Sequence, residues 1–314
     1  AQHGTDPKLK VAEAAKDQEY TVARLAAEYI EKDAKRRNRR WGDKEYQLQK
    51  YVLPRWGRRP ATSITIRDVV RLNDEMQEIG AATARNIYAV VRHMFAWAQE
   101  RQQVPSNPCM VKAPPPIRSR ERTLIGEEVV AIWNALPGYP FGTIVQLLFL
   151  TAQRRTNVAE MKWADIDLEK EEWVIPGDRY KSKREHLVPL PPMAQEILQG
   201  LPQAGEFVFS GRVTADRPFS GFSKAKARLD RACGVEGWRL HDIRRTVATM
   251  MQEIGIAPHV IEAVEGRVSG SRGGVAGIYQ RYAYDREKRD ALDVLSRHLE
   301  AMLVPGASNS EKTT

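Results

Sequence analysis

The chain has 314 residues, enough for about two domains with separate hydrophobic cores, and a mean hydropathy of −0.51. Its longest apolar stretch, residues 141–150, is about half as long as a membrane span, which excludes an integral membrane protein. Lys and Arg number 49 against 40 Asp and Glu, so the formal net charge of +9 favours a polyanionic partner such as nucleic acid.

The beginning of the chain predicts a missing upstream domain, and the two cysteines predict a reducing environment. Residues 1–18 are polar and Lys-rich, and the chain opens without Met and without a signal peptide. We expect this segment to be a linker remnant that follows a missing upstream domain. Cys109 and Cys233 form no CxxC motif, so they indicate neither a disulfide framework nor a cysteine zinc site. A reducing, cytoplasmic environment is expected.

The apolar spacing in residues 19–104 predicts a small all-helical domain. Its four helices are expected from Thr21 past Ile30, from Asp43 to Val52, from Thr65 to Gly80, and from Thr83 past Ala98. Thr65 and Thr83 are the expected N-caps of the last two helices. Pro54 is expected to end the second helix, because proline has no N–H with which to continue the hydrogen-bond ladder.

A dense basic run follows the first helix and ends just before Trp41. Its candidate phosphate contacts are Lys35, Arg36, Arg37, Arg39 and Arg40. Clustered Lys and Arg side chains beside an aromatic residue are suited to a nucleic-acid backbone. The alternative is an ordinary solvated helix face.

Residues 105–122 contain several prolines, including the run 114–116, and are expected to form an extended interdomain linker. Residues 123–304 form the second expected domain, and residues 305–314 a disordered tail. The helices of this second domain are expected at 127–136, 142–151, 193–199, 220–233, 241–253, 258–265 and 285–302. Its strands are expected at 165–168, 172–175 and 186–190. A polar hairpin, 177–184, joins the last two strands. The fold class is therefore mainly α with a small antiparallel β-sheet, an α+β architecture in two domains.

Four segments of the second domain combine cations with polar or aromatic residues. They are Thr151–Asn157 (TAQRRTN), Tyr180–Lys183 (YKSK), His241–Thr246 (HDIRRT) and Gly277–Tyr282 (GIYQRY). Any one of them is a weak signal alone. Their order along the chain is informative, because it resembles the catalytic domain of the tyrosine recombinases, specifically the phage and genomic-island integrases.

That family carries an approximate TGxRxxE motif, a lysine on a β-hairpin, an HxxR motif and a late nucleophilic tyrosine. The resemblance implies that Arg154 and Arg244 are the two active-site arginines, Lys181 the hairpin lysine, His241 the histidine and Tyr279 the nucleophile. It also implies that the helical first domain is a core DNA-binding domain that clamps DNA together with the catalytic domain.

The residue types suit phosphodiester chemistry. Two guanidiniums can orient the phosphate and stabilise its more anionic transition state. His241 can accept the tyrosine proton or donate a hydrogen bond to the phosphate, and Lys181 can protonate the departing 5′-oxygen. Because the phosphotyrosine bond stores the energy of the broken linkage, strand exchange needs neither ATP nor a metal, and no cofactor is expected.

Two positions depart from the family pattern. The acid that usually follows the first arginine by three residues is Asn157 here, which removes a charge beside Arg154. The family's late LGH or LNH motif aligns with Glu265-Gly266-Arg267, so Arg267 stands where a phosphate-contacting His or Trp is usual. Arg267 is a candidate catalytic residue, and the alternative is that it is merely exposed to solvent.

Several neighbouring residues compete for the predicted roles. Arg155 is an alternative to Arg154. Lys183 and Arg184 compete with Lys181, and Tyr282 and Tyr284 with Tyr279. The motif spacing favours Arg154, Lys181 and Tyr279, and His241 lies one helical turn before Arg244 on the same face.

The resemblance implies a site-specific recombinase that integrates or excises a mobile element through a 3′-phosphotyrosyl intermediate. Its expected partners are double-stranded DNA attachment sites, three further copies in a homotetramer on DNA, and DNA-bending or excision accessory proteins in a bacterial cytoplasm, at the nucleoid. The apolar stripe of residues 285–302 would pack on a neighbouring protomer, and the missing upstream domain would be an arm-binding domain. The alternatives are a DNA-binding protein of the same fold without turnover, and a type IB topoisomerase.

Overall fold

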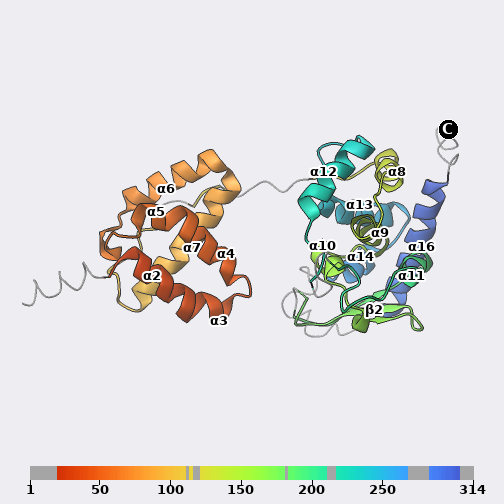
Figure 1. Ribbon diagram of the computed structural model, residues 1–314, viewed down its shortest axis with the longest axis horizontal. Helices are drawn as coiled ribbons and strands as arrows, with labels where there is room; N and C mark the ends of the chain where they lie inside the picture. The colour runs from red at the N-terminus through yellow and green to blue at the C-terminus, as the bar shows by residue number, and fades with distance from the viewer. Residues whose placement is uncertain are drawn as a thin grey trace, which may run out of the picture. The chain divides into compact units, whose positions relative to one another are not determined.

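The computed structural model describes residues 20–110, 113–115, 121–180, 183–210, 217–267 and 283–304. The chain divides between Arg120 and Glu121 into two compact units, each with its own hydrophobic core (Figure 1). The described parts are mostly helical, with a three-stranded antiparallel sheet in the second unit. The expected fold class is confirmed.

The first unit is built from helices alone within its described residues. Its elements are α2 (Val22–Tyr29), the π turn η1 (Ile30–Ala34), α3 (Lys35–Arg37), α4 (Trp41–Gln47), the π turn η2 (Leu48–Val52), α5 (Leu53–Trp56), the 3₁₀ turn η3 (Ala61–Ser63), α6 (Ile66–Ile79) and α7 (Ala81–Glu100). The first three run on without a break, so the basic run begins on the last turn of one long helix. Thr21 caps that helix by accepting the N–H of Arg24 at 3.3 Å.

Pro54 does not end the second helix, so that prediction was wrong. The π turn η2 carries the chain into α5, where Pro54 occupies the first turn. At this point the N–H of Leu53 reaches back five residues to the carbonyl of Leu48. In this wider turn the hydrogen bonds depart from the α-helical pattern just before the proline. The missing N–H of Pro54 therefore does not interrupt a regular series of α-helical hydrogen bonds.

The start of α6 follows the prediction and the start of α7 does not. The Thr65 side chain accepts the N–H of Asp68, and the Asp68 carboxylate accepts the N–H of Thr65 at 2.8 Å. These two reciprocal bonds form a capping box. α7 begins at Ala81 instead of Thr83, because Gly80 adopts a φ of 147° that turns the chain directly into the new helix. Its expected apolar stripe, including Ile87 and Met94, is buried.

The segment after α7 packs against the helical unit. Val104 and Cys109 are buried in its core. The Tyr88 hydroxyl donates to the carbonyl of Cys109 at 3.1 Å, and the Asn107 amide donates to the carbonyl of Arg92 at 3.1 Å. The first residues of the proline-rich segment therefore belong to the first unit, although the sequence placed them in an extended spacer.

The second unit surrounds the buried helix α9. Its elements are α8 (Gly126–Asn134), α9 (Phe141–Thr151), α10 (Arg155–Ala159), the 3₁₀ turn η4 (Trp163–Asp165), β1 (Ile166–Asp167), β2 (Glu172–Ile175), β3 (His186–Pro189), α11 (Pro192–Gln199), α12 (Phe222–Cys233), α13 (Leu240–Glu253), α14 (Pro258–Glu265) and α16 (Asp285–Leu303). β2 lies between β1 and β3, and pairs with β3 from Glu172↔Pro189 to Ile175↔His186. All the expected strands are present, and the short helix α10 was not predicted.

The apolar stripe of α16 is buried within its own unit. Leu292, Leu295 and Leu299 are fully buried, and α16 packs against β3, α14, α8 and α9. The prediction that this stripe docks on a neighbouring protomer was therefore wrong. Amphipathic periodicity shows that a helix face will be covered, but not which element covers it.

Candidate active site

Arg154 is positioned by the sharp end of α9. Ala152 adopts a left-handed conformation with φ 55°, which turns the chain so that Arg154 becomes the N-cap of α10. The Arg154 guanidinium lies 5.2 Å from the centre of the Tyr180 ring. Its Nη1 is buried and has no hydrogen-bond partner among the described residues. The alternative, Arg155, is exposed and lies over the Phe222 ring instead, at 4.7 Å.

The second predicted arginine, Arg244, is buried at the centre of the site and only 4% exposed. Its Nη1 donates to the carbonyl of Ala152 at 2.6 Å, its Nη2 donates to the carbonyl of Glu265, and its Nε lies 3.1 Å from Glu265 Oε1. Burial lowers the pKa of Arg244 to about 10, while Glu265 acts in the opposite direction. Arg244 therefore stays charged at neutral pH.

His241 lies one turn before Arg244 on α13, and its side chain reaches the surface. The start of this helix is fixed by Asp242, whose carboxylate accepts the N–H of Arg239 at 2.8 Å. Partial desolvation of the ring, with the Arg244 and Arg245 cations, lowers the pKa of His241. The neutral imidazole, which can accept a proton, therefore predominates at pH 7.

Arg267 joins the same cluster through Glu265. Its Nε lies 2.6 Å from Glu265 Oε2, and its Nη2 donates to Glu265 Oε1 at 3.0 Å. The Glu265 side chain is 1% exposed and that of Arg267 48% exposed. Between them, Gly266 ends α14 with a φ of 57°, and a Cβ at this position would overlap the Tyr180 hydroxyl. The loop after α14 therefore requires glycine at this point.

Tyr180 and His186 form the floor of the cluster. Their rings stack with centres 4.8 Å apart. The Tyr180 hydroxyl donates to the carbonyl of Glu265 at 3.1 Å, and His186 Nε2 lies 3.1 Å from the carbonyl of Val264. These contacts tie the β2–β3 hairpin to the end of α14. Lys181 and Tyr279 lie outside the described residues. Tyr180, the described residue that precedes Lys181 in the sequence, contacts Arg154.

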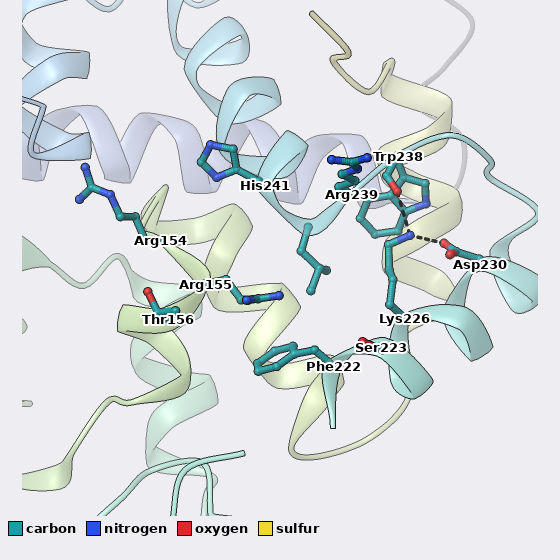
Figure 2. Close-up of a pocket in the computed structure, with 11 residues that line it drawn as sticks. Arg154, Arg155, Thr156, Phe222, Ser223, Lys226, Asp230, Trp238, Arg239 and His241 are labelled. Atoms are coloured by element: carbon teal, nitrogen blue, oxygen red, sulfur yellow. Dashed lines mark hydrogen bonds and ion pairs between the residues drawn. The ribbon is translucent and has the colours of Figure 1, made fainter. Parts of the chain in front are cut away.

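Beside this cluster the surface contains a pocket of about 570 Å³ (Figure 2). Arg154 and His241 lie at one end of it, and Lys226 and Trp238 at the other. The Lys226 ammonium lies 3.7 Å from the centre of the Trp238 ring and donates to the carbonyl of Trp238 at 3.1 Å. The pocket is therefore cationic and aromatic, a combination suited to an anionic ligand.

Glu265 was not identified as a functional residue from the sequence. It follows Ile261 by one helical turn, on the buried side of α14. A charged residue at an apolar position of an amphipathic helix could have marked it. Asn157, where the family usually has an acid, has its Nδ2 buried without a hydrogen-bond partner among the described residues.

The basic run of the first unit is exposed and largely ion-paired. Lys35 pairs with Glu31 at 2.5 Å and lies 4.9 Å from the centre of the Trp41 ring. Arg37 and Arg40 pair with acids of their own helices, at 2.8 Å and 2.7 Å. Exposed pairs of this kind contribute only about 0.2–1 kcal/mol, so a phosphate can compete with them. Arg36 and Arg39 are exposed on the same segment.

No group of three or more His, Cys, Asp or Glu side chains in the described part of the chain is arranged to bind a metal ion. None of the described helices is long and apolar enough to span a membrane.

Two family models match the chain. The model of the phage integrase family matches residues 122–280, and that of the phage integrase central domain matches residues 22–111. The matched ranges fall in both units, and residues 122–280 include every predicted catalytic residue from Arg154 to Tyr279. The chain belongs to the phage integrase family, and the predicted resemblance to the tyrosine recombinases is confirmed.

Curated relatives are prophage integrases. Prophage integrase IntZ of Escherichia coli (strain K12) is 29% identical over 268 residues, which cover 82% of this chain and 65% of the relative. Prophage integrase IntA of the same strain is 28% identical over 254 residues, covering 77% of this chain and 60% of the relative. The chain therefore spans less than two thirds of the length of either relative.

Solved structures with the same fold contain DNA. A lambda integrase tetramer bound to a Holliday junction matches with a TM-score of 0.67 and 18% identity, over 86% of this chain and 83% of that chain. The Tn1549 transposon integrase in complex with circular intermediate DNA matches with a TM-score of 0.61 and 15% identity, over 86% and 98%. These likenesses show the fold of the chain.

His186 gives the second unit a predictable dependence on pH. Burial, reinforced by the Lys288 cation, lowers the pKa of His186 to about 3. A histidine in the unfolded chain titrates near 6.5, so between these values the unfolded state binds the extra proton and stability falls as pH falls. We expect this single group to remove about 2 kcal/mol of the free energy of unfolding at pH 5.

The measurement is urea unfolding of the wild type and of His186→Gln at pH 7, 6 and 5. Glutamine keeps a donor for the carbonyl of Val264 but does not titrate. The stability advantage of the wild type should therefore shrink as pH decreases. If the difference in free energy of unfolding between the two proteins is constant across this range, His186 has an ordinary pKa in the folded state.

Proposed function

We propose that the chain is a site-specific DNA recombinase that cleaves and rejoins one strand at a time through a 3′-phosphotyrosyl intermediate. Its biological role is the integration or excision of a mobile element. The observation that carries the proposal is the convergence of Arg154, Arg244 and Arg267 around the Tyr180–Glu265 contact, with His241 lining the same pocket as Arg154. Membership of the phage integrase family supports it independently.

The arginines provide the electrostatic part of the mechanism. A phosphodiester brings one negative charge, and its transition state carries more negative charge on the non-bridging oxygens. Arg154 offers a guanidinium whose Nη1 has no hydrogen-bond partner among the described residues, and Arg244 retains N–H groups beyond its three contacts with described residues. Charged, pre-oriented donors of this kind stabilise the transition state more than the ground state.

Proton transfers complete each cleavage step. The Tyr279 hydroxyl attacks the phosphorus, its proton passes to neutral His241, and the 5′-oxygen leaves with a proton from Lys181. The phosphate is thereby transferred from the DNA 5′-oxygen to the tyrosine. A 5′-hydroxyl from another strand reverses these steps and joins the new pair of strands. The lowered pKa of His241 supports its role as acceptor.

The other parts of the proposal concern binding and assembly. The helical unit, residues 19–104, binds the core DNA through Lys35, Arg36, Arg37, Arg39 and Arg40, and the catalytic unit contributes the reacting site. The partners are double-stranded attachment sites, further copies of the chain in a tetramer, and accessory proteins that bend DNA or favour excision. The DNA-bound integrases of the same fold, one of them a tetramer on a Holliday junction, support this assembly. The protein works at the bacterial nucleoid in the cytoplasm.

The test is to trap the covalent protein–DNA complex on a nicked duplex. The nick lets the short cleaved fragment diffuse away from the complex. Such a duplex can be selected from a random-sequence pool by repeated covalent capture on the wild-type chain. We expect a protein–DNA band on a denaturing gel for the wild type and for Tyr282→Phe, and none for Tyr279→Phe. The tyrosine pair is matched, because the same hydroxyl is removed three residues apart.

Other outcomes separate the alternatives. A band that persists in Tyr279→Phe but is lost in Tyr282→Phe or Tyr284→Phe assigns the nucleophile to another tyrosine. Tight DNA binding with no covalent band in any protein favours a binding protein without turnover. Relaxation of supercoiled DNA that does not depend on the selected sequence favours a type IB topoisomerase.

A further inference from the structure

Glu265 is a buried carboxylate in a site that must receive an anion. It is 1% exposed, at the end of α14. An ionised carboxylate away from water is costly unless it is paired and hydrogen-bonded. Asp242, another buried acid, is explained by its cap on α13. Glu265 caps the start of none of the described helices, and its oxygens contact arginines instead.

Both carboxylate oxygens of Glu265 are occupied by guanidiniums. Oε1 lies 3.1 Å from Arg244 Nε and accepts from Arg267 Nη2 at 3.0 Å, while Oε2 lies 2.6 Å from Arg267 Nε. Arg267 is thus bound by two parallel contacts, which fix the plane of its guanidinium as well as its position. Lysine could not reproduce this two-point geometry.

The backbone carbonyl of Glu265 makes two further contacts in the same cluster. It accepts the Tyr180 hydroxyl at 3.1 Å and also Arg244 Nη2. One residue therefore joins the arginine of α13, the hairpin that leads to Lys181, and the arginine after α14. Asn157 is neutral, and among the described residues the carboxylate that pairs with Arg244 and Arg267 is that of Glu265.

We infer that Glu265 is a positioning residue that fixes Arg244 and Arg267 as one pre-oriented pair for the scissile phosphate. This role rests on the proposed function. Glu265 does not touch the DNA; it sets the spacing and the planes of two cations that do. Without its charge, the two guanidiniums repel each other and Arg267, whose side chain is half exposed, moves toward solvent.

The experiment measures the single-turnover rate of covalent complex formation and, separately, the Kd for the same selected nicked duplex at fixed salt. The variants are Glu265→Gln, Arg267→Lys and their combination. Glu206→Gln, on an exposed carboxylate paired with Lys162, is the control for the loss of one negative charge. Thermal melting of each protein shows whether it is folded.

We expect Glu265→Gln and Arg267→Lys each to slow covalent complex formation on the order of 10–100-fold, as misplaced catalytic groups do. The Kd should change much less, because the overall charge that attracts DNA is nearly kept. The combined variant should be about as slow as the slower single variant, since both changes break the same connection. Glu206→Gln should react at the wild-type rate.

Four results would overturn the inference. One is a Glu265→Gln variant that reacts as fast as the wild type. Another is a combined variant whose loss is the product of the two single losses, since independent effects exclude a shared connection. If Glu265→Gln melts near the assay temperature, Arg267→Lys decides, because its half-exposed side chain can change without unfolding the core; a wild-type rate for it contradicts the pairing. A wild-type chain that forms no covalent complex contradicts the proposed function itself, and this role of Glu265 with it.

Discussion

Replacing Arg154 by Ala is expected to slow covalent complex formation by about 10²–10³-fold, the usual cost of removing one transition-state donor. The reason is that Arg154 leaves Nη1 without a partner among the described residues, next to the ring of Tyr180. A donor that no described residue uses is suited to a substrate phosphate. Because little structure depends on it, the free energy of unfolding should change by less than about 1 kcal/mol.

The neighbouring arginine provides the control. Arg155 is exposed, lies over Phe222, and differs from Arg154 by one position in the chain. Arg155→Ala should weaken DNA binding in proportion to its lost charge and leave the single-turnover rate within a few fold. The assignment of Arg154 is contradicted if the two variants exchange these phenotypes. Gel quantification of the covalent band over time, with saturating protein, measures both rates.

Arg244→Ala is expected to affect stability and rate together. The change leaves the buried Glu265 carboxylate with one cation fewer and removes donors to the carbonyls of Ala152 and Glu265. Breaking a buried ion pair from one side costs about 3–5 kcal/mol. The rate of covalent complex formation should fall at least as far as in Arg154→Ala, on the order of 10³-fold.

Urea unfolding and the same covalent assay separate the two effects. Arg245→Ala, one residue further along α13 and less buried, is the matched control, and should keep most of the stability and rate. Arg244→Lys tests the donors, because it keeps the charge but cannot make the three contacts of the guanidinium. An Arg244→Ala protein with wild-type stability would mean that the Glu265 contact contributes nothing to the fold.

Much of the fold could be predicted because local signals agree with it. The capping box at Thr65, the alternating strands 172–175 and 186–189, and most of the periodic helices appear close to where their residue patterns place them. The one-turn spacing of His241 and Arg244 also predicts their shared face on α13. In each case the information lies within a few consecutive residues.

The structure differs from the predictions where contacts between residues far apart in the sequence determine it. The helix continues past Pro54 because a π turn, with Leu48 and Val52 buried, changes the bonding pattern before the ring. The stripe of α16 is covered by its own unit, which periodicity alone does not specify. The pattern of α14 marks Glu265 as a charged residue at an apolar position but does not give its role, because two of its partners, Arg244 and Tyr180, are 21 and 85 residues away.

In the proposed reaction, a tyrosine of this chain carries the DNA strand through its 3′-phosphate. The most direct measurement is mass spectrometry of the covalent complex after digestion with nuclease and protease. We expect a peptide in which Tyr279 carries a nucleotide through the 3′-phosphate. A nucleotide attached through its 5′-phosphate, attachment to a residue other than tyrosine, or cleaved DNA with no attached protein would contradict it.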